Sequence, residues 1–380
     1  MTEHLEHHLH PIGESLEQEA DALINPEAAV EVPPPEEMSL IGRLRQPRTI
    51  LSIAVPLLII VIALFLNRDS LAEVPGYIGH ANPLFLVAAF VIYYMGFPLR
   101  GYRWVTLLKG AGYRVSTKDG TEILFLSWLV NCIVPAKLGD VYRAYLLKLN
   151  SPVSATRTLG TVFVERILDL FAITILGLAA GYIRFRDNLG DLPFAVQVIF
   201  ALGVALVVLM AVGLVVLRNY GRRLILRLPL PGRAVDLYDR FEEGVFNAVG
   251  LRGLPWLGLL TIVIWGTEAL RLYCVIQALG FGDLHLGLSG VLFVALIGSL
   301  LTAVPLTPAG LGAVEGGLWA VLVKVFGVAG GQATAILLVD RTISVFSIVV
   351  LGSIAYVISS KPRGGGMKVE EIVPVSARAT

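Results

Sequence analysis

An apolar block without a single charged residue occupies positions 194–217 and limits the possible folds severely. It is about as long as a helix needs to cross a hydrocarbon core of about 30 Å. Inside lipid every backbone polar group must be paired within the segment, so the block is expected to be helical. Transmembrane β-strands alternate polar and apolar residues, and this block does not alternate. The block therefore predicts an α-helical membrane protein.

The composition extends this prediction to the whole chain. Of its 380 residues, 56% are hydrophobic and only 16% are charged, whereas about 25% are charged in an average soluble domain. We therefore predict an all-α, polytopic protein whose partners are membrane lipids. The formal net charge of +1 gives no indication of a nucleic-acid partner.

Six full crossings and two shorter hairpins are expected. Each hairpin is interrupted near its middle by Pro and Gly, so each half is short for a full span. This pattern predicts broken or re-entrant helices. The crossings are predicted at 49–67, 84–108, 158–183, 194–217, 255–279 and 332–359, and the hairpins at 121–149 and 288–327.

The polar segments divide the rest of the chain. Residues 1–47 are predicted to be a disordered tail, 48–360 the membrane domain and 361–380 a second tail. Residues 68–82 are expected to form an external loop. Residues 219–249 mix Arg with Leu, Phe and Tyr, which predicts an interfacial helix. The distribution of Lys and Arg favours a cytoplasmic-membrane protein with both termini in the cytoplasm.

No cofactor or metal is expected. The two cysteines, Cys132 and Cys274, lie in apolar stretches without a second cysteine nearby and are expected to pack as small hydrophobic residues. The first ten residues include four histidines, which are a weak metal signal without a rigid scaffold.

Three features recur in the same order in the two halves of the chain. Both hairpins contain P-A-x-L-G, at 135–139 and at 308–312. An L-R-x-Y motif precedes each one, at 99–102 and 270–273, and an acid followed by Arg comes after, at 165–166 and 340–341. The repeats, about 84–183 and 255–359, begin on opposite sides of the membrane in the predicted topology. Inverted repeats with broken helices are typical of transporters.

Charged residues within the membrane cost free energy and therefore need partners or a function. Lys137, Asp140 and Arg143 follow the first predicted break, Pro135. The N–H groups of a helix that starts there would bind a phosphate or a carboxylate, and Asp140 is suited to cap it. Alternatively, Lys137 and Arg143 extend to the membrane interface.

Glu165, Arg166 and Asp169 form a second cluster. The two acids are four residues apart and share a helix face. They are suited to bind a cationic head group, to relay a proton, or to pair structurally with Arg100 and Arg103.

A third cluster comprises Glu268, Arg271, Glu315, Asp340 and Arg341. Glu315 follows the second break within one turn and lies in apolar sequence, which makes it the strongest functional candidate. Its structural alternative is an ion pair with Arg271 or Arg341. Interfacial anchors are expected at Trp104, Trp128, Trp256 and Trp319.

These motifs resemble the flippase-like family that includes the transmembrane part of lysylphosphatidylglycerol synthases, over about residues 50–360. The first family motif is matched by Asn131, the segment P-A-K-L-G-D at 135–140, and Arg143. The second is matched by P-L-T-P-A-G-L-G at 305–312 and by Glu315. Lys137 replaces Arg and Ala309 replaces Gly in the family pattern, and Lys lacks the bidentate geometry of Arg.

The resemblance implies translocation of an anionic, aminoacylated or polyprenyl-linked lipid. The residues expected to contact or support the head group are Arg100, Arg103, Asn131, Lys137, Asp140, Arg143, Glu165, Arg166, Asp169, Arg271, Glu315, Asp340 and Arg341. The expected helix breaks are Pro135, Gly139, Pro305, Pro308, Gly310 and Gly312.

Two other functions stay open. One is a membrane-embedded transferase acting on a lipid-linked donor, with Asp140 or Glu165 as base. The other is a non-transporting partner of a separate glycosyltransferase or lipid synthase. The sequence shows no nucleophile–base pair, and only a short segment follows Ser359, whereas synthases of the family carry a soluble domain there. We therefore expect no enzymatic activity.

Overall fold

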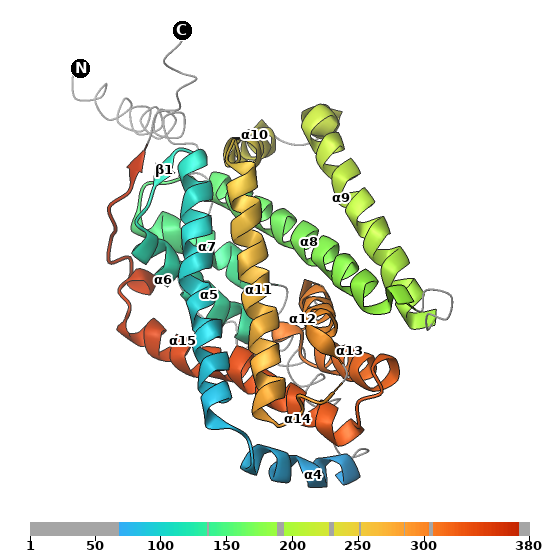
Figure 1. The fold of residues 1–380 in the computed structure, drawn as a ribbon. Helices are drawn as coiled ribbons and strands as arrows, with labels where there is room; N and C mark the ends of the chain where they lie inside the picture. Colours follow the sequence, from blue (N-terminus) through green and yellow to red (C-terminus); the bar gives the residue numbers. More distant parts are fainter. Residues whose placement is uncertain are drawn as a thin grey trace, which may run out of the picture.

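The computed structural model describes residues 68–134, 137–187, 194–227, 232–250, 252–284, 286–303 and 307–371. Nearly all of them are helical, which confirms the predicted all-α class (Figure 1). The predicted crossing at 49–67, the first tail, Pro135 and Pro305 lie outside the described residues.

Twelve α-helices account for most of the described chain, and short 3₁₀ and π-helical segments interrupt the second half. The α-helices are α4 (Arg68–Gly79), α5 (Pro83–Gly110), α6 (Thr117–Ile133), α7 (Leu138–Asn150), α8 (Ala155–Phe185), α9 (Phe194–Arg227), α10 (Gly232–Asn247), α11 (Leu254–Ala278), α12 (Gly287–Ala303), α13 (Ala313–Ala320), α14 (Gly330–Arg341) and α15 (Ser347–Ile358). The short segments are η2 (Pro308–Gly310), η3 (Val321–Val325), η4 (Thr342–Phe346) and η5 (Lys361–Arg363), and the two-residue strands β1 (Tyr113–Arg114) and β2 (Glu370–Glu371) pair antiparallel.

Five helical stretches of the described chain are long and apolar enough to cross a membrane. Four of them coincide with predicted crossings, and the fifth belongs to the second predicted hairpin. α8 covers the crossing predicted at 158–183, but Glu165, Arg166 and Asp169 interrupt its apolar sequence. The five stretches that are long and apolar enough are Pro83–Gly110, Val196–Arg227, Leu254–Ala278, Pro308–Val325 and Gly330–Ile358.

The first helix of each repeat lies at the centre of the fold. α5 and α11 pack against each other along their length. They run antiparallel, because Asn82 before α5 donates a backbone hydrogen bond to Ala278 at the end of α11, and Gly110 at the end of α5 contacts Ala248 before α11. The two halves of the chain therefore start in opposite directions, as the inverted repeat predicts (Figure 1).

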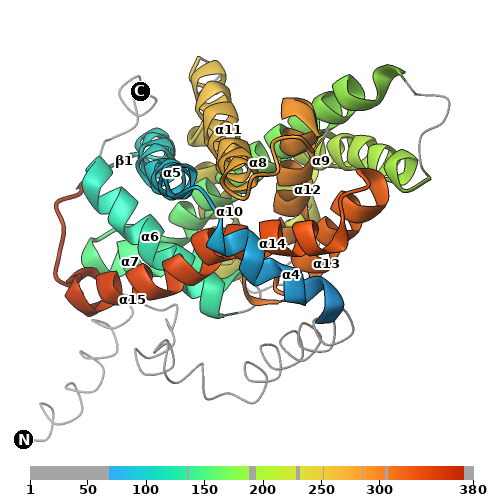
Figure 2. The same cartoon turned by 60° about the horizontal axis from the view of Figure 1, so that its bottom comes forward.

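Each hairpin leaves and re-enters the same end of the bundle. In the first, Asp119 near the start of α6 and Asn150 at the end of α7 both bond to Lys361. In the second, Phe326 after η3 contacts Phe293 in the first half of α12. The first hairpin returns to the end that carries β1, and the second to the end that carries α4 (Figures 1 and 2). The predicted re-entrant arrangement is therefore found, with the two breaks meeting inside the molecule.

Two predicted boundaries were wrong. Residues 68–79 of the expected loop form α4, which packs against α14 (Figure 2). The crossing predicted to end at 217 continues as one helix through Arg227. Arg and Leu are good helix formers, so the hydrogen-bond ladder of α9 extends beyond its apolar block. α10 is a separate helix that packs on α8, where Arg157 and Glu243 form an ion pair of 2.6 Å.

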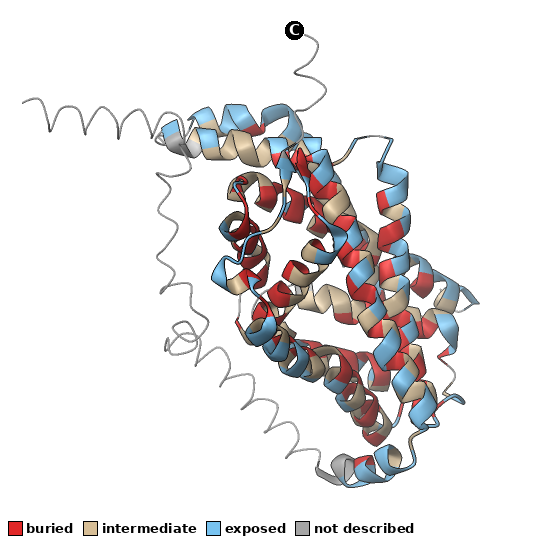
Figure 3. Ribbon diagram, turned by 90° about the vertical axis from the view of Figure 1, so that its left-hand side faces the viewer, coloured by how far each residue is buried: buried red, intermediate tan, exposed pale blue. Residues whose placement is uncertain are grey.

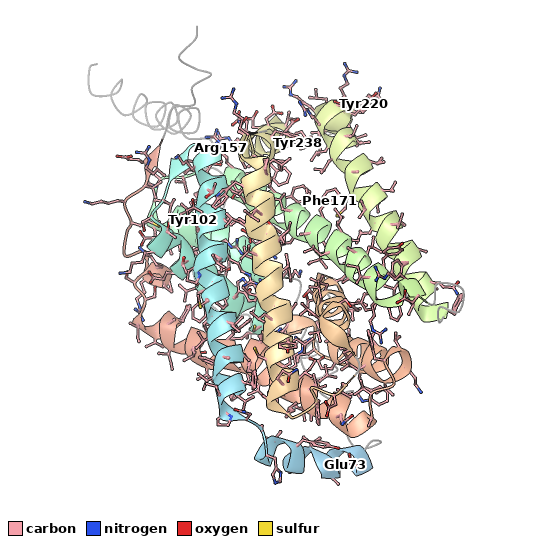
Figure 4. The ribbon with its side chains drawn as sticks, in the orientation of Figure 1. Glu73, Tyr102, Arg157, Phe171, Tyr220 and Tyr238 are labelled. Carbon is pink, nitrogen blue, oxygen red and sulfur yellow. The ribbon has the colours of Figure 1, made fainter. Side chains whose placement is uncertain are left out.

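The two ends of the bundle are polar and the outward helix faces are apolar. Figure 4 places Arg157, Tyr220 and Tyr238 at one end and Glu73 at the other. Buried residues gather on the inward faces of the helices (Figure 3). α9 exposes a continuous set of large aliphatic side chains along its apolar part, as expected for a helix that faces lipid.

Candidate functional site

A cavity of about 350 Å³ lies where the two hairpins meet. Its wall includes residues of α5, α6, α7 and α8 from the first repeat and of α11, α12, η2, α13 and α14 from the second. Lys137 of the first break and Gly310 of the second both line it. The helix breaks of both repeats therefore share one chamber, although they are far apart in the sequence.

The first break holds Lys137 in a conformation that is rare for its residue type. Its φ and ψ are 52° and 35°, in the left-handed helical region, which costs a non-glycine residue about 1–2 kcal/mol. α7 begins at the next residue. The Lys137 side chain lines the cavity and has no ion-pair partner among the described residues.

The cap of α7 comes from the preceding helix. The Oδ1 of Asn131 accepts a hydrogen bond from the Gly139 N–H at 2.9 Å. The predicted capping role of Asp140 was wrong, because its carboxylate pairs with Arg166 instead. Gly139 is required by this approach, since a Cβ there would lie 2.6 Å from Asn131 Oδ1.

The second break has the same design with different residues. Gly312 corresponds to Gly139 in the repeat, and its N–H donates to Glu315 Oε2 at 2.6 Å. Gly310 corresponds to Lys137 and also has a positive φ, of 73°. Glycine adopts this conformation without a steric penalty. Both breaks therefore need a left-handed residue here, and only the first fills the position with a cation.

Two buried arginines neutralise the acids of α8. Arg103 on α5 binds Asp169 through both Nη atoms, at 2.6 and 3.1 Å, and lies 3.4 Å from Glu165. Arg143 on α7 binds the other oxygen of Glu165 at 3.0 Å. The Arg143 side chain is fully buried, so the expectation that it extends to the membrane interface was wrong.

Arg166 connects α8 to the first break. Its guanidinium donates a bidentate pair of hydrogen bonds to the Asp140 carboxylate, at 2.8 and 3.0 Å, and lies 3.5 Å from Asp169. The side-chain amide of Asn131 lies 3.4 Å from the same Asp140 carboxylate. The motif residues of hairpin one and the charged triplet of α8 thus form one network.

A second network joins the repeats. Glu268 on α11 accepts from Arg100 at 2.6 Å and from Arg271 at 3.0 Å. Arg271 also pairs with Asp340 on α14. The alternative in which Arg100 pairs with Glu165 or Asp169 was therefore wrong. Glu268, which the family motifs do not include, is the acid shared by the repeat-equivalent arginines Arg100 and Arg271.

Glu315 pairs with Arg341, which is one of the two partners that the structural alternative proposed. Their closest atoms, Oε1 and Nε, are 2.8 Å apart. Arg341 lines the cavity, whereas its partner Glu315 does not. Arg341 directly precedes η4, a π-helical turn, and such turns are frequent at functional sites.

Within the described residues, these three ion-pair groups together with Lys137 contain one more cation than acids. Every acid has an arginine partner, and Lys137 is the cation without one. The cations are Arg100, Arg103, Lys137, Arg143, Arg166, Arg271 and Arg341, and the acids are Asp140, Glu165, Asp169, Glu268, Glu315 and Asp340.

Aromatic residues in the site were not anticipated. Trp128 and Trp265 line the cavity; the Arg100 guanidinium lies 4.9 Å from the Trp128 ring, and Trp265 Nε1 donates to Asp169 at 3.0 Å. Trp104 is fully buried, 5.1 Å from Arg143. The predicted interfacial role of Trp104 and Trp128 was wrong, because a tryptophan in an apolar helix gives no indication of which neighbour it faces.

No group of His, Cys, Asp and Glu suited to a metal ion occurs in the part of the chain that the structure describes. Cys132 lines the cavity and Cys274 is buried, and both are free thiols.

Residues 49–352 match the family model described as the lysylphosphatidylglycerol synthase TM region. A UPF0104 membrane protein of Methanocaldococcus jannaschii is 36% identical over 233 residues, which are 60% of this chain and 93% of that protein. A UPF0104 membrane protein of Methanothermobacter thermautotrophicus is 27% identical over 288 residues, 71% of this chain and 82% of that protein. The glycosyltransferase AglD of Haloferax volcanii is 28% identical over 275 residues, 64% of this chain but only 44% of that protein.

Proposed function

Because the chain belongs to the lysylphosphatidylglycerol synthase TM region family, we propose that it binds a lipid head group inside the membrane and moves it between the two leaflets. The observation that carries this proposal is the cavity shared by the breaks of two oppositely directed hairpins. In transporters built from inverted repeats, the substrate site lies at the repeat interface and is formed by broken helices.

The chemistry of the cavity fits a polar head group with acyl chains outside. Ten charged residues contribute to its wall, together with apolar residues such as Leu170, Ile173 and Val345. Charges inside a membrane domain are expensive and mark a substrate path more often than a packing role. The outward faces of the helices are apolar and suited to lipid chains.

The inverted repeat supplies a mechanism for access. Hairpin one is fastened to one end of the bundle through Lys361, and hairpin two returns to the other end. Small movements of one repeat against the other would open the shared cavity to alternate ends. The ion pairs between α5, α11 and α14 are the contacts that such a movement would rearrange.

The proposal is tested with purified protein in lipid vesicles that carry fluorescent lipids of several head-group classes. A quencher added outside reports how much label crosses the bilayer. Faster crossing than in protein-free vesicles, for at least one head group, is expected. Equal rates for every lipid in the panel would reject translocation.

A transferase is the second candidate, because a relative matched over less than half of its length is named a glycosyltransferase. Its base would be Asp140 or Glu165. Both are held by arginines, whose N–H groups occupy the carboxylate lone pairs that a base needs. Turnover of a lipid-linked sugar donor by the purified chain would establish this function instead, and co-purification with a separate transferase or synthase would support a partner role.

A further inference from the structure

We propose that Lys137 sets the charge of the head group, so that the cavity takes a phosphodiester with one negative charge and rejects an aminoacylated head group. This inference rests on the proposed function and names the class of ligand for the same site. It depends on three independent features: the charge balance of the networks, the polar atoms left without partners, and the asymmetry of the repeat.

The charge balance gives the sign and the size of the missing charge. Every acid of the three ion-pair groups is matched by an arginine within the described chain, so the unmatched charge is the Lys137 ammonium. Lys137 is half-buried, and a charge that is partly removed from water is stabilised by an opposite charge. A ligand with one negative charge would complete the balance, as a phosphodiester does.

The unpaired polar atoms indicate what the ligand must offer. Among the cavity-lining residues that are described, the buried side-chain atoms with neither a hydrogen bond nor an ion-pair partner are Nη1 of Arg100 and Nη2 of Arg341. Both are donors. Arg100 is only 3% exposed, so its free nitrogen has no access to bulk water. A ligand that carries acceptor oxygens would satisfy them, and the two non-bridging oxygens of a phosphodiester are acceptors of this kind.

The asymmetry of the repeat shows that the cation has a cost. The break requires a left-handed residue in both halves. The second half uses Gly310 at this position and has a left-handed non-glycine residue, Ala309 (φ 50°), directly before it. The first half places Lys137 in the same conformation. Left-handed non-glycine residues cluster at ligand sites. Of the two in the breaks, Lys137 and Ala309, only Lys137 has a side chain that offers a charge to a ligand.

The same balance opposes an aminoacylated head group. A lysyl ester of a phosphodiester carries two ammonium groups and one phosphate, so its net charge is +1. Bound here it would raise the excess positive charge from one to two in a cavity enclosed by the membrane domain. Like charges in such a chamber repel strongly. The cavity therefore favours a head group other than the lysylphosphatidylglycerol that the family description mentions.

The test measures the affinities of the full-length protein for three lipids in nanodiscs by native mass spectrometry. The probes are phosphatidylglycerol, a polyprenyl-phosphoryl hexose and lysyl-phosphatidylglycerol; the first two share the phosphodiester and differ in its source. Wild type is expected to prefer at least one phosphodiester over the lysyl ester by about 10-fold or more. The order of the first two identifies the source.

Substitutions locate the preference. Lys137→Gln is expected to weaken phosphodiester binding by about 10–100-fold and to remove the preference, since one charged contact is lost. Lys137→Arg keeps the charge and should retain binding, which also shows that the site folds. Lys324→Gln is the matched control, because Lys324 is an exposed lysine of hairpin two that does not line the cavity.

Two results would overturn the inference: a wild type that binds the lysyl ester as tightly as both phosphodiesters, or a preference that Lys137→Gln leaves unchanged. Either result can occur in a protein that still moves lipid. Conversely, selective binding without any lipid movement would reject translocation while leaving the role of Lys137 established.

Discussion

Replacing Lys137 with glycine removes a strained conformation and an unpaired cation at the same time. The left-handed conformation costs lysine about 1–2 kcal/mol. Glycine avoids this cost but loses about 0.5–1 kcal/mol more backbone entropy on folding. We therefore expect Lys137→Gly to raise the free energy of unfolding by about 0.5–1 kcal/mol, while head-group affinity falls by about 10–100-fold because a charged contact is lost.

The measurement is a pair of thermal unfolding curves in detergent, followed by intrinsic tryptophan fluorescence, with lipid affinity determined on the same samples. Lys137→Ala is the matched control, because alanine also removes the ammonium but keeps the strain. Glycine should melt about 1–3 °C above alanine, and both should bind lipid equally weakly. A glycine variant that melts below the alanine variant would show that Lys137 is not strained. Wild-type affinity in either variant would show that its ammonium does not contact the ligand.

Three further substitutions test the rest of the site. Gly139→Ala places a Cβ 2.6 Å from the side-chain oxygen of Asn131 and should lower Tm in a thermal unfolding experiment. The control Gly258→Ala, which has open space for the added Cβ, should leave Tm unchanged or raise it. Equal Tm values for the two variants would refute the close approach at Gly139. Glu268→Gln leaves two buried arginines without their shared acid and should cost about 3 kcal/mol in denaturant unfolding, so a change below about 0.5 kcal/mol would contradict the network. Glu315→Gln removes the carboxylate partner of Arg341 and makes the net charge of the site more positive by one. Binding of phosphatidic acid should therefore strengthen relative to binding of phosphatidylglycerol. A weaker relative affinity for phosphatidic acid would contradict the charge balance.

The repeated motifs predicted the parts of the fold that follow from local sequence. P-A-x-L-G predicted the place of both breaks, because a Pro and a Gly close together disfavour a continuous helix. The opposite directions of the hairpins followed from counting spans between the two motifs. The end of α9 was misjudged, since hydropathy reports where lipid ends and the hydrogen-bond ladder of a helix continues beyond it.

The pairing of charges was predictable only in part. Arg103 and Glu315 were assigned correct partners, because few opposite charges lie within the membrane domain. Arg100 was not, since its partner depends on how α5 and α11 are rotated against each other. The cap that Asn131 supplies crosses the break from the preceding helix, and a sequence does not show how closely two helices approach.

Lipid translocation through the Lys137 cavity is tested most directly by the rate at which a fluorescent phosphodiester lipid crosses vesicles containing wild type, Lys137→Gln or Lys324→Gln. We predict rapid crossing with wild type and with Lys324→Gln, and a loss of about 10-fold or more with Lys137→Gln. Crossing at the wild-type rate with Lys137→Gln would contradict the proposed path, and no crossing with any of the three proteins would contradict translocation itself.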